Sequence, residues 1–157
     1  MIGIPRHACH HLRDYCAAAT VHLLREREAR YPALVNAGKV TAEDAATRLE
    51  LALAIVAQWR WVVDPAAPVL PAFGERGYFG AHGFEMRDEL ATAARRQRAV
   101  ADRNPDNADA AELADLYEAV AWWQQGHPGD ARIITDVCAE RAATWRQRDA
   151  SSPRMAA

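Results

Sequence analysis

Apolar residues recur at every third or fourth position through residues 42–63, which is the period of one face of an α-helix. Thr41 precedes this run and an acidic residue, Asp44, follows three positions later, a pattern typical of a helix N-terminus. Pro65 follows the run, and proline cannot continue a helix interior. We therefore expect a buried central helix whose two ends are both fixed by local sequence.

The rest of the chain shows the same helical period. No segment of more than four residues alternates between apolar and polar side chains, as strands would require, and 35 of the 157 residues are alanine. We predict an all-α, single-domain bundle of five main helices over residues 1–157, with a disordered tail over 150–157. The predicted helices cover residues 6–30, 42–63, 85–103 and 109–125, and a fifth begins near 130.

Residues 64–84 are predicted to be a long Pro/Gly-rich loop that is ordered and packed over the helices. The segment has three prolines followed by four regularly spaced glycines, and it also contains Tyr78, Phe79 and Phe84, which makes it too apolar for a solvated linker. These aromatic side chains are expected to reach the core. The glycines follow prolines instead of a strand and no Gly-Lys-Ser/Thr occurs, which argues against a nucleotide site. No cofactor is predicted.

Overall charge, apolar runs and cysteine content indicate the cellular compartment in which we expect the protein. The formal net charge is −2, and no apolar run approaches the roughly 18 to 20 residues that a membrane helix needs. The N-terminus lacks the apolar stretch of a secretory signal, and the three cysteines form no CxxC pair. We expect a cytoplasmic protein with reduced thiols and no contact with a membrane.

One segment resembles a known group of proteins. Residues 30–57 combine Tyr31-Pro32, the turn Ala37-Gly38-Lys39 and a helix that starts after Thr41. This combination resembles small uncharacterised helical proteins of bacteriophages and proteobacterial prophages. The resemblance implies a helical hairpin and a phage or mobile-element setting, and it assigns no catalytic residue.

A protein-binding surface is predicted on the helix over 109–125. Trp122 lies opposite the apolar stripe of that helix, flanked by acidic residues, and Trp61 likewise points away from the stripe of its own helix. Tryptophan is enriched at the centres of protein interfaces, although the loop and neighbouring helices would equally account for these two if they covered them. The predicted partner-binding residues are Trp122, Glu112, Asp115, Glu118 and Trp61.

Arginines on the helix over 85–103 offer an alternative, a face that follows nucleic-acid phosphates. Four acidic residues share that helix, so the positive charge is not concentrated as counterion release requires, and nucleic-acid binding is not favoured. The arginines concerned are Arg87, Arg95, Arg96, Arg98 and Arg103.

A second alternative is a small metal-dependent enzyme at the N-terminus. His7 and His11 would lie one helical turn apart with Asp14 nearby, which could supply two imidazoles and a carboxylate to one divalent ion. Helix ends fray, which weakens this reading. We therefore expect a non-catalytic accessory protein that inhibits or modulates a host factor, or associates with itself as a homodimer, through contacts of its helix faces.

Overall fold

The computed structural model describes residues 12–126 and 129–152, and within these ranges the chain is all-α. The predicted fold class is confirmed. Only two isolated β-bridges occur in the described residues, and neither belongs to a named strand. The helices are α2 (Arg13–Asn36), α3 (Ala42–Val63), α4 (Gly83–Arg103), α5 (Ala108–Gln124) and α6 (Arg132–Ser151).

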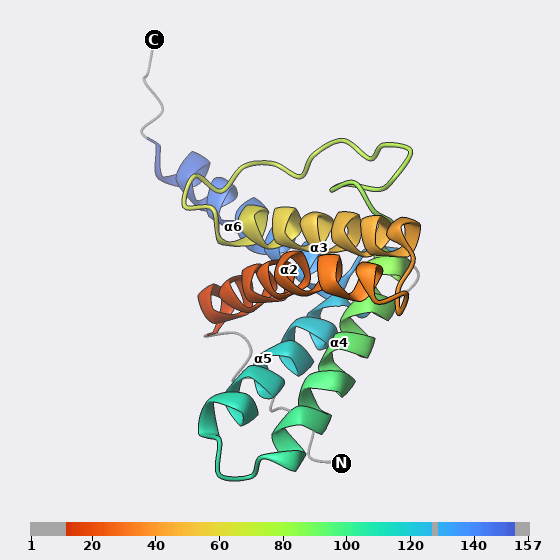
Figure 1. The fold of residues 1–157 in the computed structure, drawn as a ribbon. Helices are drawn as coiled ribbons and strands as arrows, with labels where there is room; N and C mark the ends of the chain where they lie inside the picture. Colours follow the sequence, from red (N-terminus) through yellow and green to blue (C-terminus); the bar gives the residue numbers. More distant parts are fainter. Residues whose placement is uncertain (1–11, 127–128, 153–157) are drawn as a thin grey trace.

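Two antiparallel helical hairpins form the body of the molecule. Helices α2 and α3 pack along each other, as do α4 and α5, and the α4–α5 pair crosses the α2–α3 pair (Figure 1). The core lies where the pairs cross. It includes Trp59 and Ile55 of α3 with Met86 of α4 and Val120 and Trp123 of α5, all nearly fully buried.

Helix α3 matches its prediction closely. The Thr41 hydroxyl accepts a hydrogen bond of 3.0 Å from the Asp44 backbone N–H, and the helix ends at Val63. Its buried face is broader than a single stripe, because α2, α4, α6 and the following loop all contact it. Leu53, an apolar residue within this helix, is nevertheless exposed.

Helix α2 departs from the sequence prediction at its C-terminal end. The predicted helix ended at residue 30, yet α2 continues through Pro32 to Asn36. Proline removes only one backbone hydrogen bond, and the burial of Tyr31 holds the last turns in place. The chain then reverses at Gly38, whose φ of +68° is a left-handed conformation that glycine adopts readily just after a helix.

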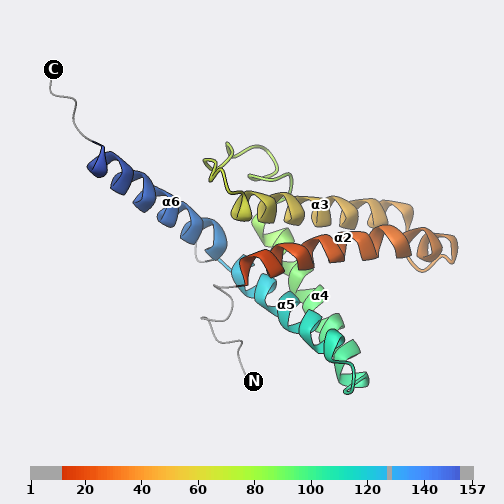
Figure 2. The same cartoon turned by 90° about the vertical axis from the view of Figure 1, so that its left-hand side faces the viewer.

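Helix α6 projects away from the body, and its contacts are confined to its first half (Figure 2). Arg13 of α2 makes two hydrogen bonds of 2.8 Å to the Glu140 carboxylate and holds that first half. Residues 144–152 are all exposed, including the large apolar side chain of Trp145. The helix continues to Ser151, into the predicted tail, and the last five residues lie outside the described ranges.

Candidate binding surfaces

The loop between α3 and α4, residues 64–82, is anchored on the side chain of Trp61. The Trp61 indole Nε1 donates to the backbone oxygens of Pro68 and Val69, at 3.1 and 3.2 Å. Its ring also lies 5.9 Å from the ring of Phe79. Trp61 is only 6% exposed. The prediction that it forms a partner surface is therefore wrong, because the loop covers it.

Arg141 of α6 also contacts Trp61 and the start of this loop. Its guanidinium donates to the backbone oxygens of Pro68 and Trp61, at 2.6 and 2.7 Å, and lies 4.5 Å from the centroid of the Trp61 ring. Burial lowers the pKa of Arg141 from its ordinary value, although nearby acidic groups oppose the shift. One arginine thus fixes the end of α3 and the start of the loop together.

The second half of the loop turns tightly at Gly77. Gly74 and Gly77 exchange two backbone hydrogen bonds, and Gly77 has a φ of +73°. A β-carbon at this position would lie 2.7 Å from the Ala81 backbone oxygen, so only glycine fits. This turn sets the direction of the aromatic residues on either side of it.

Those aromatic residues surround a cavity of about 270 Å³. Phe73 and Phe84 are 67% and 57% exposed, so the expectation that Phe84 reaches the core is wrong. Phe73 packs edge-on against Tyr78 at 5.0 Å, and Phe84 stacks on His82 at 5.4 Å. We call Phe73, Tyr78, His82 and Phe84, with the cavity they line, the loop surface. Each exposed ring is held by a neighbouring ring, which limits the rotamer entropy that binding would remove.

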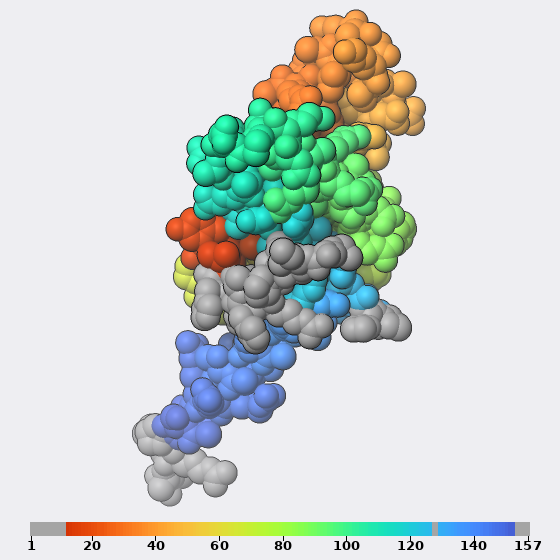
Figure 3. Space-filling model, turned by 90° about the horizontal axis from the view of Figure 1, so that it is seen from below, coloured from red at the N-terminus to blue at the C-terminus, as the bar shows by residue number. Residues whose placement is uncertain are grey.

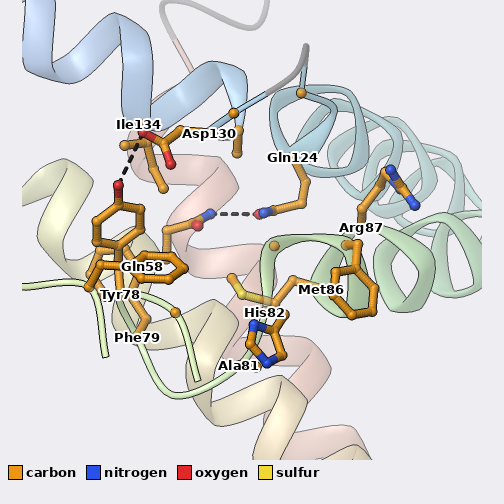
Figure 4. A pocket seen from close by; sticks show the side chains of 17 residues that line it. Gln58, Tyr78, Phe79, Ala81, His82, Met86, Arg87, Gln124, Asp130 and Ile134 are labelled. Carbon is orange, nitrogen blue, oxygen red and sulfur yellow. Dashed lines mark hydrogen bonds between the residues drawn. The ribbon is translucent and has the colours of Figure 1, made fainter. Parts of the chain in front are cut away.

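Two buried glutamines form the floor of this cavity (Figure 4). The Gln58 Nε2 donates to the Gln124 Oε1 at 2.7 Å, joining α3 to α5. The Gln124 Nε2 is buried and has no hydrogen-bond partner among the described residues. Such an unsatisfied donor is costly in a protein interior. The floor is therefore held by one amide hydrogen bond, with one donor unused.

The rim of the loop surface carries one ion pair and one hydrogen-bonded carboxylate. The Tyr78 hydroxyl donates to the Asp130 carboxylate at 3.2 Å, and partial burial together with this carboxylate raises the pKa of Tyr78 above its ordinary value. Arg87 pairs with Asp88 at 3.2 Å. The loop surface therefore offers aromatic area and a hollow, with the negative charge of Asp130 remaining at its rim.

The predicted surface around Trp122 is not assembled as expected. Asp115 and Glu118 both pair with Arg98 of α4, so a single positive charge within the chain offsets half of their combined charge. Glu112 is exposed. Trp122 is half-buried, packed edge-on against Trp123 at 4.8 Å and covered by the guanidinium of Arg132 at 4.5 Å. The structure separates these residues into an α4–α5 ion-pair cluster and a partly covered tryptophan.

Contacts within the chain also engage several of the arginines that were predicted to contact nucleic-acid phosphates. Arg98 is committed to two carboxylates and Arg87 to one, and Arg95 donates to the Thr92 hydroxyl. Arg96 faces a different cavity, between α2 and α4, whereas Arg103 lies at the turn that joins α4 to α5. These five side chains do not form one continuous positive face.

The predicted N-terminal metal cluster falls mostly outside the described ranges. His7 and His11 are not described, and Asp14 is exposed at the start of α2. In residues 12–126 and 129–152 no group of three His, Cys, Asp or Glu side chains could hold a metal ion. Within the same ranges, no helix is both long enough and apolar enough to cross a membrane.

Comparison of the chain with protein families, with curated proteins and with solved structures finds no match in any of the three. The geometry itself is therefore the basis for assigning a function.

Proposed function

We propose that this protein is a non-catalytic accessory protein that binds a protein partner through the loop surface. The observation that carries the proposal is the exposure of Phe73 and Phe84 at the mouth of a 270 Å³ cavity. Large aromatic side chains are costly to leave in water and are enriched at the centres of protein interfaces. The loop surface replaces the Trp122 face as the favoured contact.

The way the loop is held supports a binding role. Ordered loops of this length in compact domains are usually functional. This one is fixed by Trp61 and Arg141 at its start and by Arg76 pairing with Glu50 of α3 at 3.1 Å. A preorganised loop loses little entropy on binding, so more of the contact energy is available for affinity.

The chemistry of the loop surface indicates what the partner presents. Its rim has one internal ion pair, Arg87–Asp88, and the hydrogen-bonded Asp130 carboxylate, and its exposed rings flank a hollow. We infer that an apolar side chain of the partner inserts between Phe73 and Phe84. A phage or mobile-element setting, with a host protein or a second copy of the chain as partner, is part of this proposal and depends on the sequence resemblance alone.

Site-specific photocrosslinking in cells that encode the protein tests the proposal. A photoreactive phenylalanine analogue placed at position 73 or 84 should give one discrete crosslinked species. Matched controls are positions 15 and 53, because Tyr15 and Leu53 are also large apolar side chains, 59% and 53% exposed, in other parts of the structure. Equal crosslinking at all four positions, or none at 73 and 84, would contradict the proposal.

A further inference from the structure

A second cavity, of about 310 Å³, lies between the end of the α2–α3 hairpin and α4. Figure 3 shows the α2–α3 turn, in orange, extending past the α4–α5 pair, in green and teal. We call this the hairpin cavity. Apolar side chains from both sides line it: Leu23, Tyr31, Leu34, Val40 and Val100.

Four arginines also line the hairpin cavity, and only two of them are neutralised. Arg27 is buried and pairs with Glu89 of α4, while Arg30 pairs with Glu26 at 2.8 Å. The remaining two are Arg48 of α3 and Arg96 of α4. Neither of their guanidinium groups makes a hydrogen bond or ion pair with the part of the chain that the structure describes.

This charge pattern distinguishes the hairpin cavity from an ordinary solvated surface. Exposed arginines usually point into bulk water, where their field is screened. Arg96 is itself exposed and Arg48 is half-buried, but both border a hollow with apolar walls, and such walls concentrate the field and strengthen attraction for an anion. The planar guanidinium also matches carboxylate and phosphate oxygens in geometry.

The volume limits the size of a ligand. The cavity is at the lower end of the range of roughly 300 to 1,000 Å³ for ligand pockets. Because a cavity of about 150 Å³ holds benzene, there is room here for about a dozen non-hydrogen atoms. An apolar body of this size would contact Leu23, Leu34 and Val40.

We propose that the hairpin cavity binds a small amphipathic anion, with its carboxylate or phosphate head between Arg48 and Arg96 and its apolar body against α2. The proposal is independent of the loop surface, which lies at the other end of α4. It predicts that binding requires both the charge and the apolar part of the ligand.

Titration calorimetry of the full chain with four probes tests both requirements. Octanoate and octyl phosphate carry the charge and the chain, octan-1-ol lacks the charge, and inorganic phosphate lacks the chain. We expect at least one of the two amphipathic anions to bind about tenfold more tightly than octan-1-ol or phosphate, and the difference between the two identifies the preferred head group. Equal affinity for octan-1-ol or for phosphate, or no binding of either amphipathic anion, would overturn the proposal.

Substitutions locate the site. Arg48→Gln and Arg96→Gln should each weaken binding of the preferred anion about fivefold or more, because each removes one charge-assisted contact. Arg95→Gln is the matched control, since Arg95 is the neighbouring residue on α4, is exposed and does not line the cavity. All three changes are at polar surface positions, and circular dichroism would verify their helix content. Equal loss in the Arg95→Gln variant would show only a general charge effect and would overturn the assignment.

Discussion

The loop surface and the hairpin cavity share helix α4 but differ in their chemistry. Near its N-terminus α4 supplies Phe84 and Arg87 to an aromatic hollow, where Arg87 is paired with Asp88. Three turns later it supplies Arg96 and Val100 to a cavity with two unneutralised guanidinium groups. One helix therefore serves two surfaces, and the neighbours it packs against decide what each can bind.

The difference also predicts how each surface responds to its surroundings. Binding at the loop surface should depend on shape and apolar area, which salt scarcely weakens. Binding at the hairpin cavity should depend on charge and weaken as salt is added. The two surfaces can therefore be disrupted separately, beginning with the residues that hold each in place.

The largest expected effect is in the wall of the hairpin cavity. Arg27→Leu would leave the Glu89 carboxylate buried without its partner, since the two side chains are only 7% and 12% exposed. The cost should be about 3 to 5 kcal/mol of the free energy of unfolding. Arg30→Leu, which breaks an exposed pair on the next turn, should cost less than about 0.5 kcal/mol. Urea denaturation measures both, and equal costs would contradict the burial of the Arg27–Glu89 pair.

The second-largest expected effect comes from releasing the loop between α3 and α4. Arg141→Met would remove the donor to three backbone oxygens, those of Pro68, Trp61 and Val62, and the cation above the Trp61 ring. We expect a loss of about 2 to 3 kcal/mol and faster proteolysis within the loop. Arg146→Met, at an exposed position of the same helix, is the control and should change neither. An intact loop in the Arg141→Met variant would show that these Arg141 contacts are dispensable.

The floor of the loop surface gives an asymmetric prediction. Gln58→Leu would leave both polar atoms of the Gln124 amide without a hydrogen-bond partner. Gln124→Leu would instead remove an amide that already has one unsatisfied donor. Gln58→Leu should therefore cost about 1 to 2 kcal/mol, more than Gln124→Leu, and the double variant should recover most of the loss. A double-mutant cycle by chemical denaturation measures this, and additive losses would contradict it.

The smallest effect concerns pH. Burial raises the pKa of Tyr117, in the hairpin cavity, above its ordinary 10.0, so the folded state favours the neutral phenol. This contribution is fully present below pH 10 and is lost as pH rises toward the folded pKa. Between pH 8 and pH 11, the free energy of unfolding of the wild-type chain should fall by about 1 kcal/mol more than that of the Tyr117→Phe variant.

Tyr78 of the loop surface provides the comparison for that titration. Its pKa is also raised, but its side chain is more exposed than that of Tyr117. The pH-dependent difference between wild type and Tyr78→Phe should therefore be smaller. Denaturation midpoints measured from pH 8 to pH 11 show which tyrosine has the larger effect on stability. A larger effect at Tyr78 than at Tyr117 would contradict the prediction.

The helices could be predicted from sequence because their determinants are local. Thr41 and Pro65 bound α3 within a few residues of its ends, and Gly38 marks the preceding turn. Pro32 shows the limit of this reasoning. Its effect on α2 depended on whether Tyr31 would be buried by tertiary contacts.

The candidate sites were harder to predict because they depend on distant residues. Periodicity placed Trp61 off its helix stripe, but its burial depends on groups that include Arg141, 80 residues away. The pairing of Arg98 with Asp115 had a signal in the sequence. A short connection between the predicted helices over 85–103 and 109–125 makes them antiparallel, and the two residues lie at similar distances from it.

The central claim is that Phe73 and Phe84 are the contact residues for a protein partner. The most direct measurement is the affinity of the crosslinked partner for the wild-type chain, for Phe73→Ala/Phe84→Ala and for the control Tyr15→Ala/Leu53→Ala. Both phenylalanines are exposed, so their loss should change stability by less than about 0.5 kcal/mol. It should nevertheless weaken binding at least thirtyfold, about 2 kcal/mol, while the control binds like wild type. Wild-type affinity in the phenylalanine variant, or equal losses in both double variants, would contradict the account.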